Sequence, residues 1–148
     1  MKIKLAIIAL AAAMAVTAGT ADARRHERRP IVPQTFPVAP VLADPEYTTL
    51  LAGVTFHFGA GGGGRVIAPT SANHTASAFH KSDEVACSRA LANSLIALHD
   101  AAIAQGGNAV VNIKSNYNDV LFNSTTEFQC GVGGPVARVS LTGTIVRR

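Results

Sequence analysis

The chain has 148 residues and a formal net charge of +4, and it contains two cysteines. The excess positive charge lies near the N-terminus, because the sequence from Pro30 onward holds seven Lys or Arg and seven Asp or Glu residues. A neutral folded part argues against nucleic-acid binding, which depends on a basic surface. The length after residue 23 suits one domain and leaves no room for two.

The first 23 residues have the order of a secretory signal peptide. Lys2 and Lys4 precede an apolar run over residues 5–16, and the small-x-small motif Ala21-Asp22-Ala23 follows. This order predicts export with cleavage after Ala23, and the apolar run is too short to span a bilayer. We therefore expect a periplasmic or secreted protein.

A short basic arm follows the predicted cleavage site. Its arginines are Arg24, Arg25, Arg28 and Arg29, and Glu27 is its acidic residue. Such a run can contact an anionic membrane surface. A solvated tail is the other interpretation.

The segment over residues 30–45 is rich in proline, at positions 30, 33, 37, 40 and 45. Because proline fixes φ and has no amide hydrogen, the segment is predicted to form neither a helix nor a central strand. We expect the arm and this segment, residues 24–45, to form an extended tether before a domain that begins near Glu46. An ordered extended segment on the domain surface is the alternative.

The first strand is predicted within residues 51–59, where apolar and polar side chains alternate. The next residues, 59–64, formally contain a G-x-G-x-x-G pattern, which binds pyrophosphate when it joins a strand to a helix. Here an extended stretch containing Pro69 follows, so we expect a hairpin loop whose glycines take positive φ. Residues 70–80 are either an edge strand or an irregular connection.

The clearest predicted helix covers about residues 83–105. Ser82 is a suitable N-cap, acidic residues follow it, and Gly106 supplies a stop. The apolar stripe consists of Cys87, Leu91, Leu95, Leu98 and Ala102, and Val85, Ile96 and Ile103 are expected to widen it.

Three strands are predicted after the helix, over residues 109–117, 125–130 and 138–146. In the first of them Val111, Ile113 and Tyr117 are expected on one face. Residues 118–124 and 131–135 have the composition of hairpin connections. These elements predict a single α+β domain over residues 46–148, with one helix packed on a largely antiparallel sheet of four to five strands.

The two cysteines lie on predicted buried faces, Cys87 on the helix and Cys130 on a strand. In an oxidising compartment such a pair favours a disulfide. A reactive thiol or a metal ligand is the alternative, although Cys130 has neither a nearby histidine nor a CxxC partner.

Four segments carry a resemblance to known proteins. They are residues 83–87, 105–113 and 127–130, and residues 136–139 with Gly143. Together they resemble small exported proteobacterial proteins often labelled "excinuclease subunit". More distantly, the chain is similar to the outer-membrane sensor lipoprotein of the Rcs pathway and to the heavy-metal-binding-domain family. The resemblance, over about residues 81–146, implies a compact sheet with a packed helix and a disulfide between Cys87 and Cys130.

Candidate chemistry is sparse along the chain. No G-x-S-x-G or H-E-x-x-H motif occurs, and the neighbours His99 and Asp100 are expected to point in different directions on the helix. We therefore expect a non-catalytic protein with no cofactor. A candidate metal site consists of His57, His74 and His80, which would meet if residues 70–80 paired with the first strand.

A candidate partner contact consists of Asn112, Lys114, Asn116 and Tyr117 beside the loop over residues 118–123, since loops on a rigid scaffold carry function. The resulting hypothesis is an exported, disulfide-linked binding or sensing module of the cell envelope. Its expected partner is an envelope protein or an anionic membrane surface. A periplasmic metal-binding protein that uses the surface histidines is the alternative.

Export predicts a processed N-terminus. Protein recovered from the periplasm of an expressing cell should have the intact mass of a chain that begins at Arg24, because the peptidase cleaves after the small residue Ala23. Mass spectrometry measures this directly. A recovered chain that still begins at Met1 would contradict the predicted route.

Overall fold

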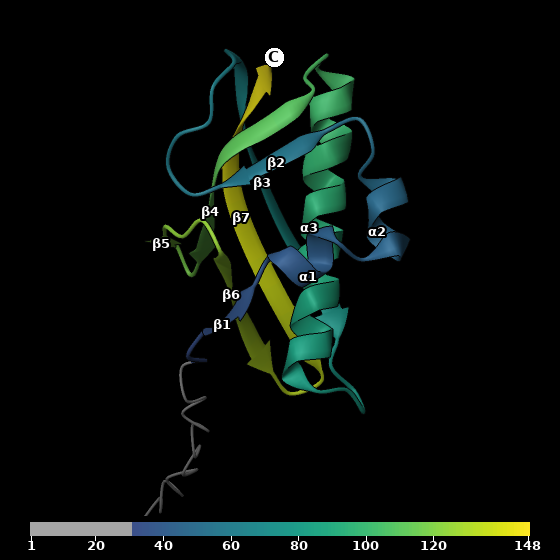
Figure 1. Ribbon diagram of the computed structural model, residues 1–148. Coiled ribbons are helices and arrows are strands. Elements are labelled where there is room, and N and C mark those ends of the chain that lie inside the picture. The colour runs from purple at the N-terminus through teal and green to yellow at the C-terminus, as the bar shows by residue number, and fades with distance from the viewer. Residues whose placement is uncertain (1–30) are drawn as a thin grey trace, which may run out of the picture.

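The structure, a computed structural model, describes residues 31–148 (Figure 1). Its elements are β1 (Gln34–Pro37), α1 (Ala39–Leu42), α2 (Pro45–Leu50), β2 (Thr55–Phe58), β3 (Arg65–Ser77), α3 (Asp83–Ala104), β4 (Ala109–Tyr117), β5 (Val120–Phe122), β6 (Glu127–Gly133) and β7 (Val136–Arg147). One main helix, α3, packs on a mixed, mostly antiparallel open sheet of seven strands. This confirms the predicted α+β class, with more strands than expected. The predicted signal peptide and basic arm lie outside the described residues.

Strand β7 is the centre of the sheet. β3 pairs with it in antiparallel fashion from one end to the other, with Arg65 opposite Arg147 and Ser77 opposite Val136. The other edge of β7 pairs first with β6 and then with β4. Beyond these strands, β1 pairs with β6, and both β2 and β5 pair with β4. β2 runs parallel to β4, which makes the sheet mixed.

Helix α3 begins and ends where the sequence predicts. The hydroxyl of Ser82 accepts a hydrogen bond from the amide of Val85 at 3.3 Å, and Gly106 follows the helix with a φ of 76°. The predicted stripe is fully buried. Val85 and Ile103 are exposed instead of widening it, because at 3.6 residues per turn both lie about 120° around the helix from Leu91.

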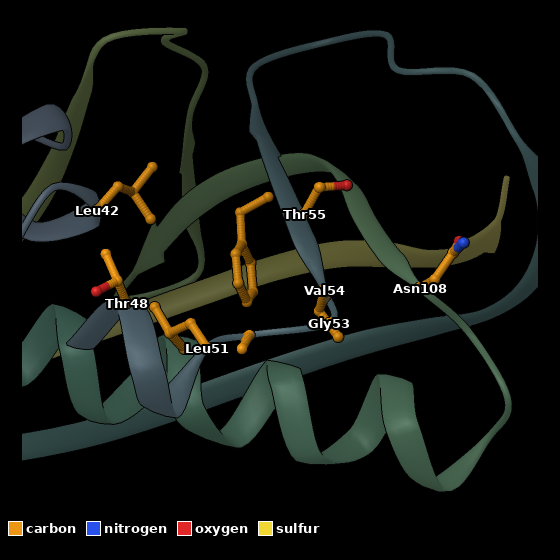
Figure 2. Close-up of a pocket in the computed structure, with 9 residues that line it drawn as sticks. Leu42, Thr48, Leu51, Gly53, Val54, Thr55 and Asn108 are labelled. Atoms are coloured by element: carbon orange, nitrogen blue, oxygen red, sulfur yellow. The ribbon is translucent and has the colours of Figure 1, made fainter. Parts of the chain in front are cut away.

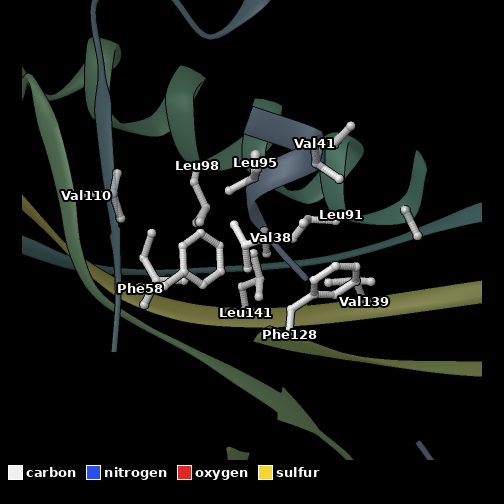
Figure 3. Packing of buried hydrophobic residues seen from close by; sticks show 14 of the residues in the cluster. Val38, Val41, Phe58, Leu91, Leu95, Leu98, Val110, Phe128, Val139 and Leu141 are labelled. Carbon is white, nitrogen blue, oxygen red and sulfur yellow. The ribbon is translucent and has the colours of Figure 1, made fainter. Parts of the chain in front are cut away.

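The main core lies between α3 and the sheet (Figure 3). Leu91, Leu95 and Leu98 of the helix face Val139 and Leu141 of β7, and all five side chains are inaccessible to solvent. Phe128 of β6 and Phe58 of β2 complete this layer. The buried hydroxyl of Ser94 donates to the carbonyl of Val139 at 3.0 Å, so the one polar side chain buried on α3 is hydrogen-bonded.

Strand β4 contains a bulge at Asn112, whose φ is 53°. The pairing register with β7 shifts between Val111 and Lys114. The extra residue turns Val111 to the outer face of the sheet, away from α3, where it clusters with Ala109 and Val146. Ile113 stays in the main core. The prediction that Val111 shares a face with Ile113 is wrong for this reason.

The glycine-rich segment over residues 59–64 packs against the outer-face cluster. Gly62 has a φ of 91°, and a Cβ on it would overlap the side chain of Val111. The segment connects β2 to β3, which pair with different strands. The predicted hairpin loop is therefore wrong, although several of its glycines do take positive φ. Residues 70–77 belong to an edge strand, as one of the two alternatives held.

The proline-rich segment is folded from Gln34 onward. β1 pairs with β6, and the amide of Val38 donates to the carbonyl of Thr126 at 2.9 Å. Pro40 and Pro45 occupy the first turns of α1 and α2, where a helix needs no amide hydrogen from them. The expected extended tether is thus wrong for residues 34–45, which include the buried Val41 and precede the predicted domain start.

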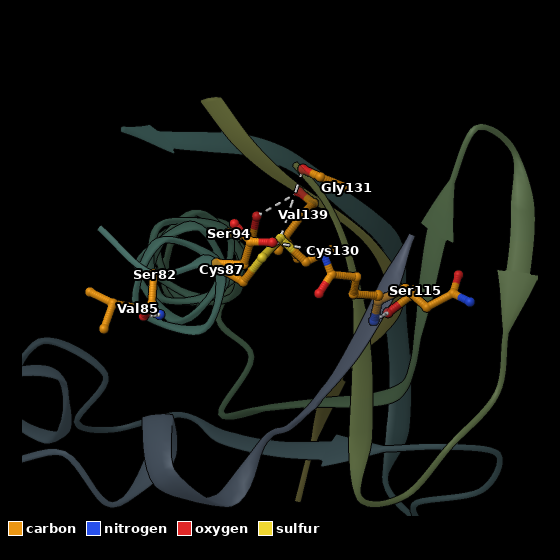
Figure 4. Close-up of a disulfide and its surroundings, with 11 residues drawn as sticks. Ser82, Val85, Cys87, Ser94, Ser115, Cys130, Gly131 and Val139 are labelled. Atoms are coloured by element: carbon orange, nitrogen blue, oxygen red, sulfur yellow. Dashed lines mark hydrogen bonds between the residues drawn. A yellow bond between two sulfur atoms is a disulfide. The ribbon is translucent and has the colours of Figure 1, made fainter. Parts of the chain in front are cut away.

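A disulfide joins Cys87 of α3 to Cys130 of β6 (Figure 4). Both residues are inaccessible to solvent, and their Cα atoms lie 5.8 Å apart. This confirms the predicted pairing. Because disulfides form and persist in oxidising compartments, the bond indicates a protein that works outside the cytoplasm. Separately, no helix within residues 31–148 is long and apolar enough to cross a membrane.

Reduction of the disulfide should destabilise the domain substantially. The bond links residues 43 positions apart, and closing a loop of that length lowers the entropy of the unfolded chain by an amount worth about 4 kcal/mol. Urea unfolding should show a lower midpoint for the wild-type protein in dithiothreitol. The Cys87→Ala/Cys130→Ala variant is the control, and its midpoint should not change on addition of the reductant. An equal response of both proteins would contradict the prediction.

Candidate functional site

An apolar groove lies between α2 and β2 (Figure 2). Its volume is about 650 Å³, which is in the range of pockets that hold ligands. Leu42, Leu51, Val54 and Phe56 supply its apolar surface, and Thr48, Thr55 and Asn108 add polar groups. The groove therefore combines a mainly apolar lining with a few hydrogen-bonding groups.

A second hollow of about 350 Å³ continues this groove toward β1. Leu42 and Phe56 line both hollows. The second hollow is also bordered by Pro37, Phe58 and Thr126. The two hollows together follow β2 along its length, and we call them the β2 groove.

The edge of β2 that faces away from β4 has no strand partner within the described residues. The amides of Thr55 and Gly59 donate to carbonyls of the β4 side at 3.1 and 2.8 Å. The backbone groups of successive residues in a strand point to alternate edges. Phe56 and Phe58 therefore direct their amide and carbonyl groups away from β4, to the free edge. An apolar groove and a row of unpaired backbone groups thus lie side by side.

The long outer edge of the sheet, on β3, is protected from further pairing. Pro69 has no amide hydrogen, and the carbonyl of Thr75 accepts a hydrogen bond from the side chain of Asn93 at 3.0 Å. Because these positions are six residues apart on one strand, they point to the same edge. Such features hinder edge-to-edge association along β3.

His99 holds the wall of the β2 groove in place. Its Nε2 donates to the carbonyl oxygen of Ala52 at 2.8 Å, in the turn between α2 and β2. Its Nδ1 lies 3.0 Å from a carboxylate oxygen of Asp100, so the prediction that these neighbours point in different directions is wrong. The side chain of His99 is only 14 % exposed, and its contacts anchor a turn.

Tyr47 on α2 packs against the main core. Burial raises the pKa of its hydroxyl, and the charges of Glu46 and Asp44 add to the rise, whereas Arg89 opposes it. The hydroxyl therefore stays protonated at neutral pH and supplies a hydrogen-bond donor, not an anion.

The four predicted partner-contact residues all lie on β4. Asn116 and Tyr117 line a polar pocket of about 320 Å³ together with Asn73, Arg138, Asp119 and their neighbours. Lys114 lies opposite Thr142 of β7, and Asn112 forms the bulge. The structure thus brings two of the four residues into one pocket, and partner contact there stays a prediction.

The adjacent loop contains a strand that the sequence analysis missed. Asn118 and Asp119 both have positive φ, 52° and 61°, and they connect β4 to β5 as a two-residue hairpin turn. Aspartate and asparagine are among the residues that tolerate this conformation. The dipeptide Asn118-Asp119 is therefore the sequence feature from which this hairpin could be predicted.

The three candidate metal ligands are not brought together. His57 lies on β2 and His74 on β3, and β4 and β7 separate these strands. His80 lies before α3 with its ring 3.9 Å from that of Phe79. Residues 70–77 pair with β7 and not with β2, so the condition for the site is unmet. Between residues 31 and 148, no group of three or more His, Cys, Asp or Glu residues could hold a metal ion.

The β2 groove does not follow from the sequence predictions, because one of its walls comes from the segment that is predicted to be an extended tether. Leu42 lies on α1, and Thr48 and Leu51 belong to α2 and its end. The available signal was Asp44-Pro45, since the Asp44 side chain caps α2 by accepting from Glu46 at 2.9 Å and Pro45 takes the first helical position.

In comparisons with known proteins, no family model, curated protein or solved structure matches the chain. The resemblance to small exported proteobacterial proteins therefore stays a prediction.

The position of the Tyr117 ring in the polar pocket requires a glycine at position 131 of β6. A Cβ on Gly131 would overlap the ring of Tyr117, so Gly131→Ala should lower the free energy of unfolding by about 1 to 3 kcal/mol through overpacking. Urea unfolding of this variant, of Tyr117→Ala and of the double variant forms a thermodynamic cycle. The Gly131→Ala cost should shrink in the Tyr117→Ala background. An unchanged cost would show that the two residues are not coupled.

Proposed function

We propose that this protein is an exported, non-catalytic binding module that holds an extended, apolar peptide segment of an envelope protein in the β2 groove. The supporting observation is that the groove and the unpaired edge of β2 lie side by side. The disulfide supports the location, since it requires an oxidising compartment.

Binding would add a strand to the sheet. The free amide and carbonyl groups of Phe56 and Phe58 would bond to the backbone of the peptide, as in other cases of strand addition. In an extended peptide alternate side chains point to one face, so every second side chain would enter the β2 groove. Four residues of β2 set the length of the paired segment.

The lining of the groove defines the chemistry of the peptide. No Lys, Arg, Asp or Glu side chain lines either hollow. A charged side chain placed there would lose its hydration without gaining an ionic partner, which is costly. Apolar side chains would instead gain roughly 25 cal/mol per Å² of buried surface. The preferred ligand is therefore apolar at alternate positions.

Two neighbouring threonines on α2 provide a matched test. Thr48 lines the groove, whereas its exposed neighbour Thr49 does not. The probe is a terminally blocked peptide of alternating valine and threonine with a lysine at each end. Thr48→Trp should fill the groove and weaken binding about tenfold, the loss expected when an apolar contact is blocked. Thr49→Trp should bind like the wild-type protein.

Nuclear magnetic resonance titration measures both affinity and location. Backbone amide shifts should change along residues 55–58, and a peptide with proline at its central positions should not bind because it lacks the amide hydrogens. Equal weakening by both tryptophan variants, or shifts confined to another surface, would contradict the proposal.

A further inference from the structure

Three chain segments meet at the end of the domain from which the chain continues toward residues 24–30. A side chain on Gly133 would overlap that of Ile31, so the first described residue lies on the end of β6. The amide of Ala78 donates to the carbonyl of Pro135 at 2.7 Å, which places the loop before α3 beside the β6–β7 turn. We call this region, residues 31–32, 78–81 and 133–136, the arm end.

The arm end exposes several large apolar side chains. Val32 and Phe79 are 78 % and 65 % exposed, and Ile31 and Val136 are each 40 % exposed. Single exposed apolar residues are ordinary, but a group gathered at one end of a small domain is typical of an interaction surface.

Positive charge adjoins this surface in the sequence. Arg29 stands two residues before Ile31, and Arg24, Arg25 and Arg28 complete the arm. A stretch of seven residues, 24–30, can span at most about 25 Å, so the covalent chain limits the distance between the four arginines and Ile31 to that value. Lys81 belongs to the arm end, and the acidic Asp83 and Glu84 follow it closely in the sequence. Asp83 accepts a hydrogen bond from the side-chain amide of Gln34 at 2.9 Å, which leaves its negative charge in place.

We propose that the arm end docks on an anionic lipid membrane. Phe79 and Val136 would enter the headgroup region, and the arm arginines would pair with lipid phosphates. Neither contribution suffices alone, since stable attachment at an interface takes an apolar insertion together with a basic segment. The acidic residues Asp83 and Glu84 at the start of α3 would weaken this attraction, so the four arm arginines have to supply the net positive charge.

Two exposed apolar residues near opposite ends of β3 serve as test and control. Phe79 lies two residues after Ser77, the last residue of β3, and Val66 lies near the other end of the strand, 69 % exposed. The protein is expressed from its full sequence, purified, and sedimented with vesicles of equimolar phosphatidylcholine and phosphatidylglycerol. Phe79→Ser should weaken partitioning about tenfold, the effect of losing one buried aromatic side chain. Val66→Ser should bind like the wild-type protein.

Charge is tested by changing all four arm arginines to glutamine. This variant should bind at least fiftyfold more weakly, since each basic residue near an anionic surface contributes on the order of fivefold. Wild-type binding should fall with added salt and be absent on pure phosphatidylcholine. Thermal unfolding of each variant confirms that it is folded, which is expected because the changed residues are exposed or lie in the arm.

Three results would overturn the proposal. They are wild-type binding by Phe79→Ser, equal losses in Phe79→Ser and Val66→Ser, and equal binding to neutral and anionic vesicles. A loss in Leu121→Ser but not in Phe79→Ser would instead assign the contact to the β4–β5 hairpin, whose Val120 and Leu121 are also exposed. The groove variant Thr48→Trp should bind vesicles normally, so failure of the peptide proposal and failure of this one are separable.

Discussion

The disulfide between Cys87 and Cys130 connects helix α3 to β6, a strand with little pairing to the central strand of the sheet. β6 pairs with β7 over only three residues, Gly131 to Gly133, yet it carries β1 on its other edge. The bond fixes β6 against α3, and β1 then positions α1 and α2. Because the net stability of a small domain is a small difference between large terms, one covalent link of this kind contributes a large share of it. We therefore expect loss of the bond to weaken the packing of the α1–α2 wall of the β2 groove as well.

The sheet edges on β3 and on β2 differ in how well they are protected from pairing with another chain. β3 is long, and an unprotected strand of thirteen residues would invite association with other chains. Pro69 and the Asn93 contact to Thr75 remove hydrogen-bonding capacity from that edge. β2 has only four residues and contains no proline. An open edge beside apolar side chains is the arrangement on which the proposed strand addition depends.

The regular elements could be predicted because their burial follows one simple period. The stripe from Cys87 to Ala102 repeats with the helix, and β7 alternates inward apolar with outward polar residues. The failures have local causes as well. Proline content predicts the absence of a helix, but a proline in the first helical turn is compatible with one, as at Pro40 and Pro45. One residue, Asn112, reverses the faces of β4. The β2 groove and the separation of His57 from His74 follow from strand order, which no local pattern contains.

The strand register of the sheet shows which end of the β2 groove lies nearer the arm end. β3 and β7 run between two ends of the domain, with Val136 and Ser77 at the arm end and Arg65 and Arg147 at the other. The first residues of β2 adjoin Ala109, which pairs with Val146 at that other end. The Pro37 side of the groove therefore lies nearer the arm end (Figure 1). With the arm end on a membrane, a peptide segment that leaves the lipid surface would meet the groove at its Pro37 side and extend along β2 away from the bilayer.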